Sequence, residues 1–490
     1  MLLLTVGLAC PILGYYLPRF LRERQQHTDS LLNIPGPASV SWIYGNMREY
    51  LLSPVYGTHE FAWLERFGSV YRIKACFGKD HLIVADPAAM QHILTSTRFD
   101  YSITYETLLW LMNGPGGIQT VRDAFEGGRE EHRRLRAGMN GGFTASVVQS
   151  YQPMLERLAH RLSVQIEELA CDSLIDVSPL LSRTALGAIS EALINRPFET
   201  LDEEFIDLNT RIVGISASVS KGYIFADIIT SNLPKTLVKW LFGLRVGALD
   251  LINRGRESAL ALGRKFISER SDGDDPGECE GIYGLLRELS SRTLEHHHQL
   301  MSSRSAVSGK GAGRTKTLTP EELIAQTSVL LLAGQDTTAT TLCFCLIELA
   351  RNPTLQEQLR EEIRARPLSQ AYSQMPLLNA VIKETLRMFP VVPFTDRMAF
   401  EDDVIPVSRP IVGRDGQQMT EFRVRKGQVL SVSIASYQRI QSVWGEDASE
   451  FNPNRWFEGG HASLNEVVGP YANLMSFISG FRTCVGWRFA

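Results

Sequence analysis

The stretch Phe477-Ile478-Ser479-Gly480-Phe481-Arg482-Thr483-Cys484-Val485-Gly486-Trp487-Arg488-Phe489-Ala490 holds one cysteine between two glycines, with an arginine two residues before it. Glycine lets a backbone turn tightly and approach a flat ligand closely. The thiolate of cysteine is the form that ligates metals, and an axial thiolate on a haem iron favours O–O cleavage. A lone cysteine is more often a small buried hydrophobe than a ligand, so the rest of the chain has to decide between these interpretations.

The full pattern resembles the haem-binding signature of the cytochrome P450 superfamily. The matching positions are Phe477, Gly480, Arg482, Cys484, Gly486 and Ala490. The resemblance implies that Cys484 is the axial ligand of a haem iron (iron protoporphyrin IX). It also implies that Arg482 pairs with a haem propionate through a charge-assisted contact, and that Phe477, Gly480 and Gly486 belong to the cofactor-binding loop.

Length and composition allow one large folded unit. The chain has 490 residues, 44% of them hydrophobic, and its formal net charge of −4 gives no reason to expect nucleic acid. The cysteines are scattered and form no CxxC pair, which argues against a disulfide framework and a zinc site. We therefore expect a reducing compartment, with six structural cysteines and one ligand.

A nearly continuous apolar run, MLLLTVGLACPILGYYL, opens the chain, and Arg19, Arg22 and Arg24 follow it. Its length lies at the lower edge of the ~17–25 residues that span a bilayer. The charges that follow the run favour a cytosolic location for the rest of the chain. The alternative, a cleaved signal peptide, lacks a basic n-region and a clear cleavage site. Ile34-Pro35-Gly36-Pro37 then resembles the proline-rich hinge of microsomal members.

Together these features predict a mostly α (α+β) chain with the cytochrome P450 fold, that is, a large helical domain, a small β-sheet region and an N-terminal membrane anchor. We expect the anchor at 1–18, a basic linker and the proline-rich hinge at 19–40, and the catalytic domain at 41–490. The connection at 121–128 is longer than is usual in the family. Members also continue for several tens of residues beyond the cysteine, whereas this sequence ends at Ala490, so we expect a truncated carboxyl end.

The first half of the sequence predicts two short strands at 68–73 and 81–85, followed by a helix from Pro87 to Leu94. In the helical run 130–136, His132 and Arg136 are four residues apart and share one face. They match the family's pair of haem-propionate contacts. Arg133 and Arg134 in the same run are available as a surface patch for an acidic electron donor, although an idle surface is equally compatible with the sequence.

A long helix is predicted from Thr319-Pro320-Glu321-Glu322, which forms a capping box, to Arg351. Ala333-Gly334-Gln335-Asp336-Thr337-Thr338 lies at its centre and resembles the family's oxygen-activating element. The resemblance implies that Asp336 and Thr337 are catalytic and deliver protons. A threonine hydroxyl can also bond to the i−4 carbonyl and bend the helix. Residues expected to face substrate are Val329, Leu332 and Ala333.

Glu384 and Arg387 form a Glu-x-x-Arg pair, which alone is an everyday helix contact. Arg455, in Pro453-Asn454-Arg455-Trp456, supplies a second arginine. By resemblance the three form a buried ion network that fixes the cysteine loop. Arg397 matches a further propionate contact, the extended residues Val392, Pro393 and Phe394 are expected to line the substrate cavity, and 428–434 is predicted as a strand.

These features predict a haem-thiolate monooxygenase of fungal, microsomal type that inserts one oxygen atom from O2 into a hydrophobic small molecule, such as a terpenoid or another secondary metabolite. The implied partners are a membrane and an NADPH-cytochrome reductase, with cytochrome b5 as a further donor and no nucleic acid. The implied location is the endoplasmic reticulum membrane, with the catalytic domain in the cytosol.

Two alternatives remain open at this point. One is an isomerase or dehydratase that uses the same haem site without a reductase, against which the Asp336-Thr337 pair argues. The other is a haem-free, inactive remnant, which the early carboxyl end suggests.

Overall fold

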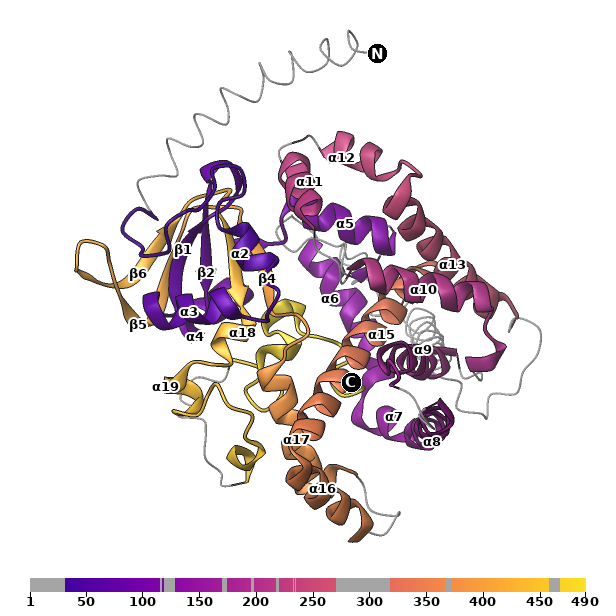
Figure 1. The fold of residues 1–490 in the computed structure, drawn as a ribbon. Helices are drawn as coiled ribbons and strands as arrows, with labels where there is room; N and C mark the ends of the chain where they lie inside the picture. The colour runs from indigo at the N-terminus through magenta and orange to yellow at the C-terminus, as the bar shows by residue number, and fades with distance from the viewer. Residues whose placement is uncertain are drawn as a thin grey trace, which may run out of the picture. The chain divides into compact units, whose positions relative to one another are not determined.

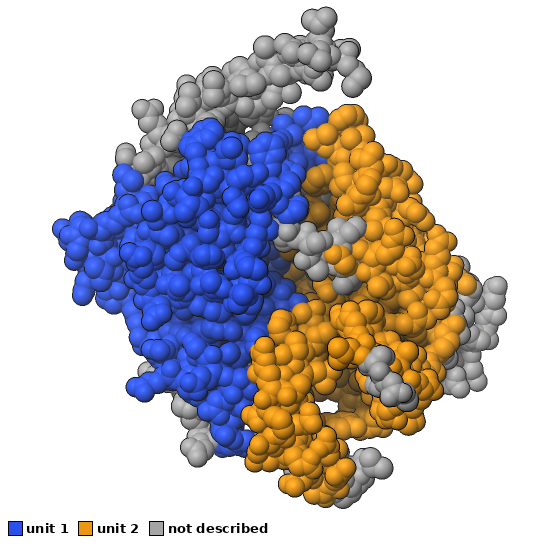
Figure 2. Space-filling model, in the orientation of Figure 1, with its two compact units in different colours: residues 1–104, 219–238, 386–483 blue, residues 105–218, 239–385, 484–490 orange. Residues whose placement is uncertain are grey.

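The computed structural model describes residues 31–114, 117–118, 128–169, 174–194, 198–216, 220–231, 233, 235–269, 318–365, 372–457 and 468–490 (Figure 1). The expected anchor, most of the linker and nearly all of the 121–128 extension lie outside these residues. The chain divides into two compact units, which Figure 2 colours separately. Unit 1 comprises Met1–Thr104, Val219–Val238 and Leu386–Thr483, and unit 2 comprises Tyr105–Ser218, Lys239–Thr385 and Cys484–Ala490.

Unit 1 carries a five-stranded sheet in the order β1-β2-β7-β4-β3 and a two-stranded sheet β5-β6. The strands are β1 (Val70–Lys74), β2 (Asp80–Val84), β3 (Phe99–Asp100), β4 (Phe394–Ala399), β5 (Asp403–Val412), β6 (Gln418–Val424) and β7 (Val429–Ser433). β7 pairs parallel with β2 and antiparallel with β4. The sheet thus joins strands from both ends of the sequence, and Leu82, Val84, Leu430 and Val432 of β2 and β7 are fully buried in one core.

Short helices complete unit 1. They are α2 (Met47–Leu51), α3 (Thr58–Phe67), α4 (Pro87–Thr95), α11 (Lys221–Ser231), α18 (Ile434–Tyr437) and α19 (Gln441–Trp444), with the 3-10 turns η1 (Cys76–Gly78), η6 (Pro453–Trp456), η7 (Met475–Phe477) and η8 (Gly480–Arg482). α4 begins as its sequence predicts: Asp86 accepts a hydrogen bond from the Ala89 N–H at 3.1 Å, and Pro87 opens the first turn.

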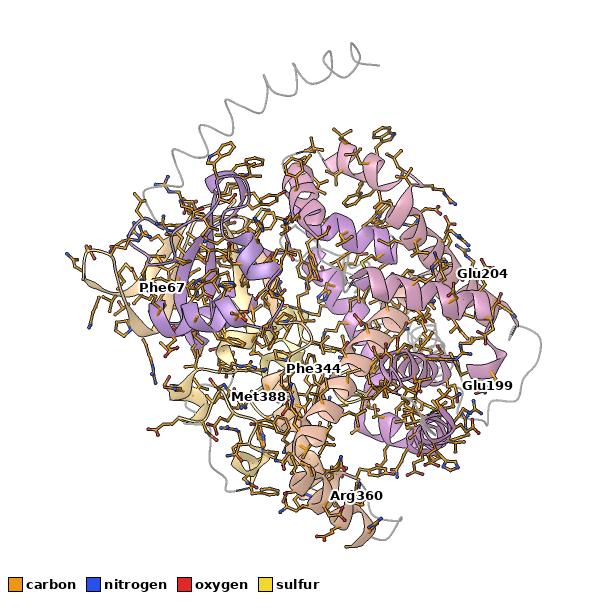
Figure 3. All side chains as sticks on the ribbon, viewed as in Figure 1. Phe67, Glu199, Glu204, Phe344, Arg360 and Met388 are labelled. Atoms are coloured by element: carbon orange, nitrogen blue, oxygen red, sulfur yellow. The ribbon has the colours of Figure 1, made fainter. Side chains whose placement is uncertain are left out.

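Unit 2 is helical. Its elements are α5 (Ile103–Asn113), α6 (Gly128–Met139), η3 (Asn140–Phe143), α7 (Ala145–Ser150), α8 (Gln152–Leu169), α9 (Ser178–Ile194), η4 (Phe198–Thr200), α10 (Glu203–Ser216), α12 (Lys235–Phe242), α13 (Gly247–Glu269), α15 (Pro320–Arg351), α16 (Pro353–Ala365), η5 (Tyr372–Gln374) and α17 (Pro376–Met388). The ranges of α5, α12 and α17 extend into both units. Figure 3 labels Phe344 on α15, Arg360 on α16 and Met388 at the end of α17.

α15 is the central helix of unit 2 and packs against α9 and α13. The predicted capping box is present, since Thr319 accepts from the Glu322 N–H and Glu322 accepts from the Thr319 N–H. A side chain on Gly334 would lie 2.8 Å from Cγ1 of Ile189, so glycine lets α15 approach α9 closely. Within the described ranges, α15 is the one helix that is long and apolar enough to cross a membrane.

The predicted local elements are confirmed with shifts of one or two residues at their ends. The expected strands at 68–73, 81–85 and 428–434 are β1, β2 and β7, and the expected helix from Pro87 is α4. The long predicted helix is α15, which the capping box and Asn352-Pro353 delimit at its two ends. α15 is continuous through Asp336-Thr337, so the bend that threonine can introduce does not interrupt it.

Candidate functional site

The candidate residues are distributed over both units, and each unit positions its own set. In unit 2, Cys484 is exposed and lies at the start of the terminal segment. Partial burial raises the pKa of the Cys484 thiol, while the backbone N–H of Gly486 and the charge of Arg136 act in the opposite direction. The Gly486 N–H and the Arg136 charge both stabilise the thiolate, which is the form of cysteine that binds a metal.

The terminal segment is held by aromatic contacts within unit 2. The Phe489 ring meets the rings of Phe143 and Tyr151 edge to face, with centroids 6.5 Å and 6.0 Å apart. A Cβ added to Gly486 would touch only Cε1 of Phe143, at 3.8 Å. A larger residue would therefore fit at position 486 among the described residues. Gly486 leaves this space open near the Cys484 sulfur.

α6 carries the predicted pair His132 and Arg136 on one face. His132 is buried and Arg136 is half-buried; burial lowers the pKa of the Arg136 guanidinium, and the nearby Cys484 opposes that effect. The structure thus brings Arg136 close to Cys484. The expectation that Arg134 belongs to a free surface patch is wrong, because Arg134 is bonded through both terminal nitrogens to Glu322 at the start of α15. Arg133 remains exposed.

The centre of α15 presents Asp336 and Thr337. The Thr337 hydroxyl donates to the Ala333 carbonyl at 2.7 Å, which is the i−4 bond that its sequence position predicts. Burial raises the pKa of the Asp336 carboxyl, and a hydrogen bond with Thr340 partly opposes this shift. Of the expected substrate-facing residues, Val329 is buried in the unit 2 core, Leu332 is half-buried and Ala333 is exposed.

The sequence did not indicate the polar contacts that tie α5 and Ile118 to α13 and α15. Gln326 on α15 accepts a hydrogen bond from the Ile118 N–H at 2.8 Å, and the Ser328 hydroxyl donates to the Met112 carbonyl at 2.9 Å. Arg256 on α13 donates to the Leu111 carbonyl at 3.0 Å. A glutamine and a serine inside an apolar helix were the available signals, because a buried polar side chain needs a partner.

In unit 1, two arginines meet at one aromatic ring. The guanidinium carbons of Arg397 and Arg482 lie 4.5 Å and 5.0 Å from the centre of the Tyr101 ring. Arg482 also pairs with Asp100 at 3.4 Å, and Arg397 donates to Thr395 at 2.6 Å and to the Asp396 carbonyl at 2.8 Å. Nothing in the sequence pointed to Tyr101 as the shared contact of these two arginines.

One nitrogen of Arg397, beside the Tyr101 ring, is available to donate to a bound ligand. Nη2 of Arg397 is buried, and none of the described residues accepts a hydrogen bond from it. A buried charged donor without an acceptor costs free energy. A carboxylate or another anion at this position would satisfy it, which fits a haem propionate.

The loop before the cysteine is held against α4 within unit 1. Gly480 has φ +73°, and a Cβ on it would lie 2.2 Å from the Leu94 carbonyl oxygen. Ile478 two residues earlier has φ +54°, a strained value for a β-branched residue. Phe477, in η7, meets the Tyr471 ring at 6.1 Å. The loop is thus fixed by close backbone packing on α4, which only glycine permits.

Gly480→Ala is expected to displace the loop from α4 and to lower both stability and haem content. The substitution combines a left-handed strain of roughly 1–2 kcal/mol with a backbone clash. Gly416→Ala is the matched control, because Gly416 has φ +79° and nothing within 4 Å of an added Cβ. Chemical unfolding of both variants measures the difference between their free energies of unfolding. Equal losses of stability in the two variants would show that the clash with the Leu94 carbonyl is unimportant.

Arg387 and Arg455 are both buried in unit 1, and the contacts described here join them to backbone carbonyls and to Asp447, so the expected network with Glu384 stays a prediction. Fully buried Arg387 donates to the carbonyls of Gln438, Ala448 and Glu450 at 2.7, 2.6 and 2.9 Å. Arg455 donates to the Trp444 carbonyl and pairs with Asp447 at 2.8 Å. Both arginines therefore hold the segment 444–450. Glu384 on α17 is completely buried as well.

Acid is expected to weaken this arrangement at Asp447. Burial raises the pKa of the Asp447 carboxyl, but bonds from Asn452 and Arg455 outweigh burial and the net pKa is lowered. The contribution of the Asp447 carboxylate to the free energy of unfolding is therefore complete above its unfolded-state pKa of about 4. This contribution is lost as the pH falls through its lower pKa in the folded protein. Urea unfolding of Asp447→Asn and the wild type should give a stability difference that shrinks below about pH 4. The exposed neighbour Glu446→Gln is the control; a difference independent of pH would contradict the assignment.

The chain matches one protein family and several of its curated members. The family model described as "Cytochrome P450" matches residues 35–490. Cytochrome P450 monooxygenase 205 of Postia placenta is 29% identical, covering 94% of this chain and 83% of the relative; cytochrome P450 monooxygenase claO of Ampulloclitocybe clavipes is 28% identical, covering 93% and 82%.

Solved structures show the same fold. A cyanobacterial cytochrome P450 with bound retinoic acid superposes with a TM-score of 0.64 at 20% identity, covering 93% of this chain and 89% of that chain. A second cytochrome P450 crystal structure gives a TM-score of 0.59 at 19% identity, covering 87% and 86%.

Proposed function

This chain belongs to the cytochrome P450 family, and from that premise we propose that it is a membrane-anchored haem-thiolate monooxygenase for a hydrophobic small molecule, such as a terpenoid. The enzyme class is an oxidoreductase that incorporates oxygen, with haem, O2 and electrons derived from NADPH. The electron donor is an NADPH-cytochrome reductase, with cytochrome b5 as a further donor. The observation that supports the proposal most is the placement of Cys484 beside the Gly486 N–H and the Arg136 charge.

Haem, when bound, supplies an iron centre that binds and splits O2. Sγ of Cys484 would hold the haem iron, and the Gly486 N–H and the Arg136 charge favour its thiolate form by partly opposing the burial that raises the pKa of the thiol. Arg397, Arg482, His132 and Arg136 are the proposed propionate contacts. The buried Nη2 of Arg397 provides the specific support, because it lacks an acceptor within the described part of the chain.

Asp336 and Thr337 are the proposed proton-handling residues. The raised pKa of the Asp336 carboxyl lets one of its oxygens hold a proton closer to neutral pH than an ordinary aspartate does. The Thr337 hydroxyl donates to the Ala333 carbonyl, so its oxygen can accept a hydrogen bond from a neighbour.

Substrate is proposed to contact Val329, Leu332 and Ala333 from α15, and Val392, Pro393 and Phe394 from the segment that leads into β4. All six side chains are apolar, which favours a hydrophobic substrate. The apolar run at 1–18 and the arginines after it support an anchor in the endoplasmic reticulum membrane, with the hinge and the catalytic domain at 41–490 on the cytosolic side.

The function is tested by loading the full chain with haem, adding an NADPH-cytochrome reductase in vesicles and supplying candidate terpenoids with isotopically labelled O2. Substrate-dependent consumption of NADPH and O2, with one labelled oxygen atom in the product, is the expected result. Product formed without consumption of O2 or NADPH would instead indicate an isomerase or dehydratase. A chain that takes up no haem would contradict the proposal altogether.

A further inference from the structure

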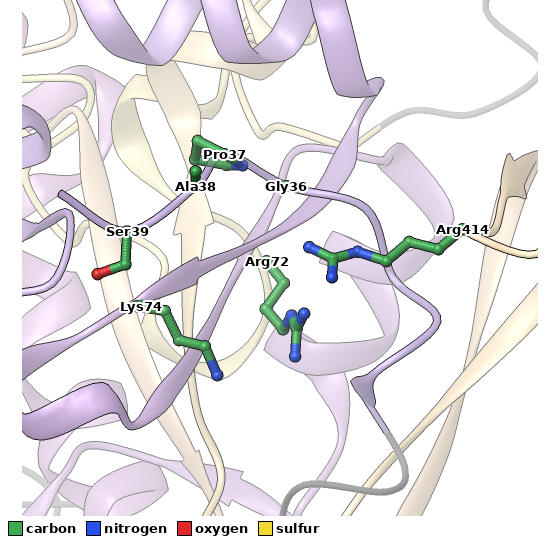
Figure 4. A pocket seen from close by; sticks show the side chains of 7 residues that line it. All are labelled: Gly36, Pro37, Ala38, Ser39, Arg72, Lys74 and Arg414. Carbon is green, nitrogen blue, oxygen red and sulfur yellow. The ribbon is translucent and has the colours of Figure 1, made fainter.

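A basic pocket of about 370 Å³ lies in unit 1, on residues that the catalytic proposal does not use. Its lining residues are Gly36, Pro37, Ala38, Ser39, Arg72, Lys74 and Arg414 (Figure 4). The volume falls within the ~300–1,000 Å³ of small-molecule sites. Three cationic side chains of this pocket come from β1 and from the turn between β5 and β6.

The charges of the pocket are unbalanced. Arg72 and Lys74 share one carboxylate, since Asp80 Oδ1 lies 3.1 Å from Arg72 Nη1 and 2.6 Å from Lys74 Nζ. Arg414 adds a further positive charge, and its guanidinium is directed toward the space beside Arg72 in Figure 4. The pKa of Arg72 is lowered by burial and by repulsion from Arg414, against the opposing effect of Asp80. Three cations and one carboxylate leave an excess that a bound anion would neutralise.

The walls of the pocket are fixed by backbone contacts rather than by mobile side chains. The Arg72 N–H donates to the Pro35 carbonyl at 2.8 Å, so the hinge is bonded to β1. A side chain on Gly36 would lie 1.7 Å from the Arg72 carbonyl oxygen, which makes glycine necessary for this approach. Asn46 donates to the Ala38 carbonyl at 2.9 Å and accepts from the Lys74 N–H at 3.1 Å. The cations therefore face a preorganised site.

An apolar rim continues directly from the lining segment. Val40, Trp42 and Ile43 are 68%, 63% and 44% exposed, although such side chains are usually buried. The Trp42 ring is held edge to face against Phe77, with centroids 5.4 Å apart. Tryptophan beside basic residues is typical of the level of lipid headgroups in membrane proteins. The occupant should therefore combine an anionic phosphate with an apolar body.

We propose that this pocket binds the phosphate headgroup of an acidic membrane phospholipid, with the acyl chains against Val40, Trp42 and Ile43. Arg414 closes over the phosphate, and Arg72 and Lys74 form the floor. The lipid would hold the hinge side of unit 1 at the bilayer surface. This site goes beyond the proposed monooxygenase function, which stands or falls independently of it.

The test uses the full haem-loaded chain in a neutral detergent and three probes: short-chain phosphatidic acid, short-chain phosphatidylcholine and inorganic phosphate. We expect saturable binding of one phosphatidic acid per chain by titration calorimetry, tighter than binding of either other probe. Arg414→Gln should weaken that binding about tenfold, because it removes one charge-assisted contact. Arg423→Gln makes the same charge change on the exposed face of β6, outside the pocket, and should leave binding unchanged.

Each other result would overturn the proposal. Equal weakening by Arg414→Gln and Arg423→Gln would mean that only the general surface charge attracts the lipid. Inorganic phosphate that binds as tightly as phosphatidic acid would identify a free-phosphate site. Absence of saturable binding would mean that there is no site at all. Haem content and oxygenase activity, measured on the same preparations, show that the variants are folded.

Discussion

Cys484→Ser is expected to abolish the thiolate-ligated haem spectrum and to lower substrate oxidation at least about 1,000-fold, which corresponds to about 4 kcal/mol of barrier. Serine keeps the shape of the side chain, so the contacts of Phe489 with Phe143 and Tyr151 should persist. A serine hydroxyl does not ionise near neutral pH, and it therefore cannot supply the electron density that a thiolate gives to iron. The absorbance of the reduced, carbon-monoxide-treated protein and its turnover with a reductase measure the two effects.

Cys343→Ser is the matched control for this experiment. Cys343 is half-buried on α15, and burial raises the pKa of its thiol. The same atom exchange there should leave the haem spectrum and the turnover close to those of the wild type. A Cys484→Ser variant that kept the thiolate spectrum would contradict the assignment, because the sulfur would then come from another cysteine.

Arg387→Lys is expected to destabilise the protein by about 3–5 kcal/mol, because the buried positive charge would remain while hydrogen bonds that satisfy it are lost. Lysine keeps the charge but loses the planar fork. The lysine side chain cannot reach the three carbonyls of Gln438, Ala448 and Glu450. It would also lose the contact with the ring of Trp444, whose centre lies 5.8 Å from the guanidinium carbon of Arg387. Chemical unfolding of the haem-loaded protein measures the loss.

Arg351→Lys provides the comparison on the protein surface. Arg351 is 70% exposed and pairs with Glu348 at 2.8 Å within the last turn of α15. Exposed pairs of this kind contribute about 0–1 kcal/mol, so the substitution should change stability little. Similar losses in the two variants would show that burial of Arg387 has no special energetic role.

The sequence could predict the features that depend on neighbouring residues. The capping box of α15, the start of α4 at Pro87 and the shared face of His132 and Arg136 all follow from spacing along one segment. Helix caps and strand patterns are local, so the boundaries of these elements differ from expectation by only a residue or two.

The sequence could not predict partners that meet only after folding. Asp447 as the carboxylate partner of Arg455 and the ring of Tyr101 between two arginine contacts both depend on tertiary distances. The same reason explains the wrong expectation for Arg134, whose charge suggested an exposed position until α15 brought Glu322 beside it. The basic pocket was missed because Arg72, Lys74 and Arg414 are brought together by the approach of the β5–β6 turn to β1.

The central claim is that sulfur of Cys484 binds the iron of a haem. X-ray absorption at the iron edge of the haem-loaded full chain tests it most directly, with Cys484→Ser measured beside the wild type. We expect one sulfur neighbour of iron in the wild type and only nitrogen or oxygen neighbours in the variant. Iron surrounded by nitrogen and oxygen alone in the wild type, or sulfur retained in the variant, would contradict the claim.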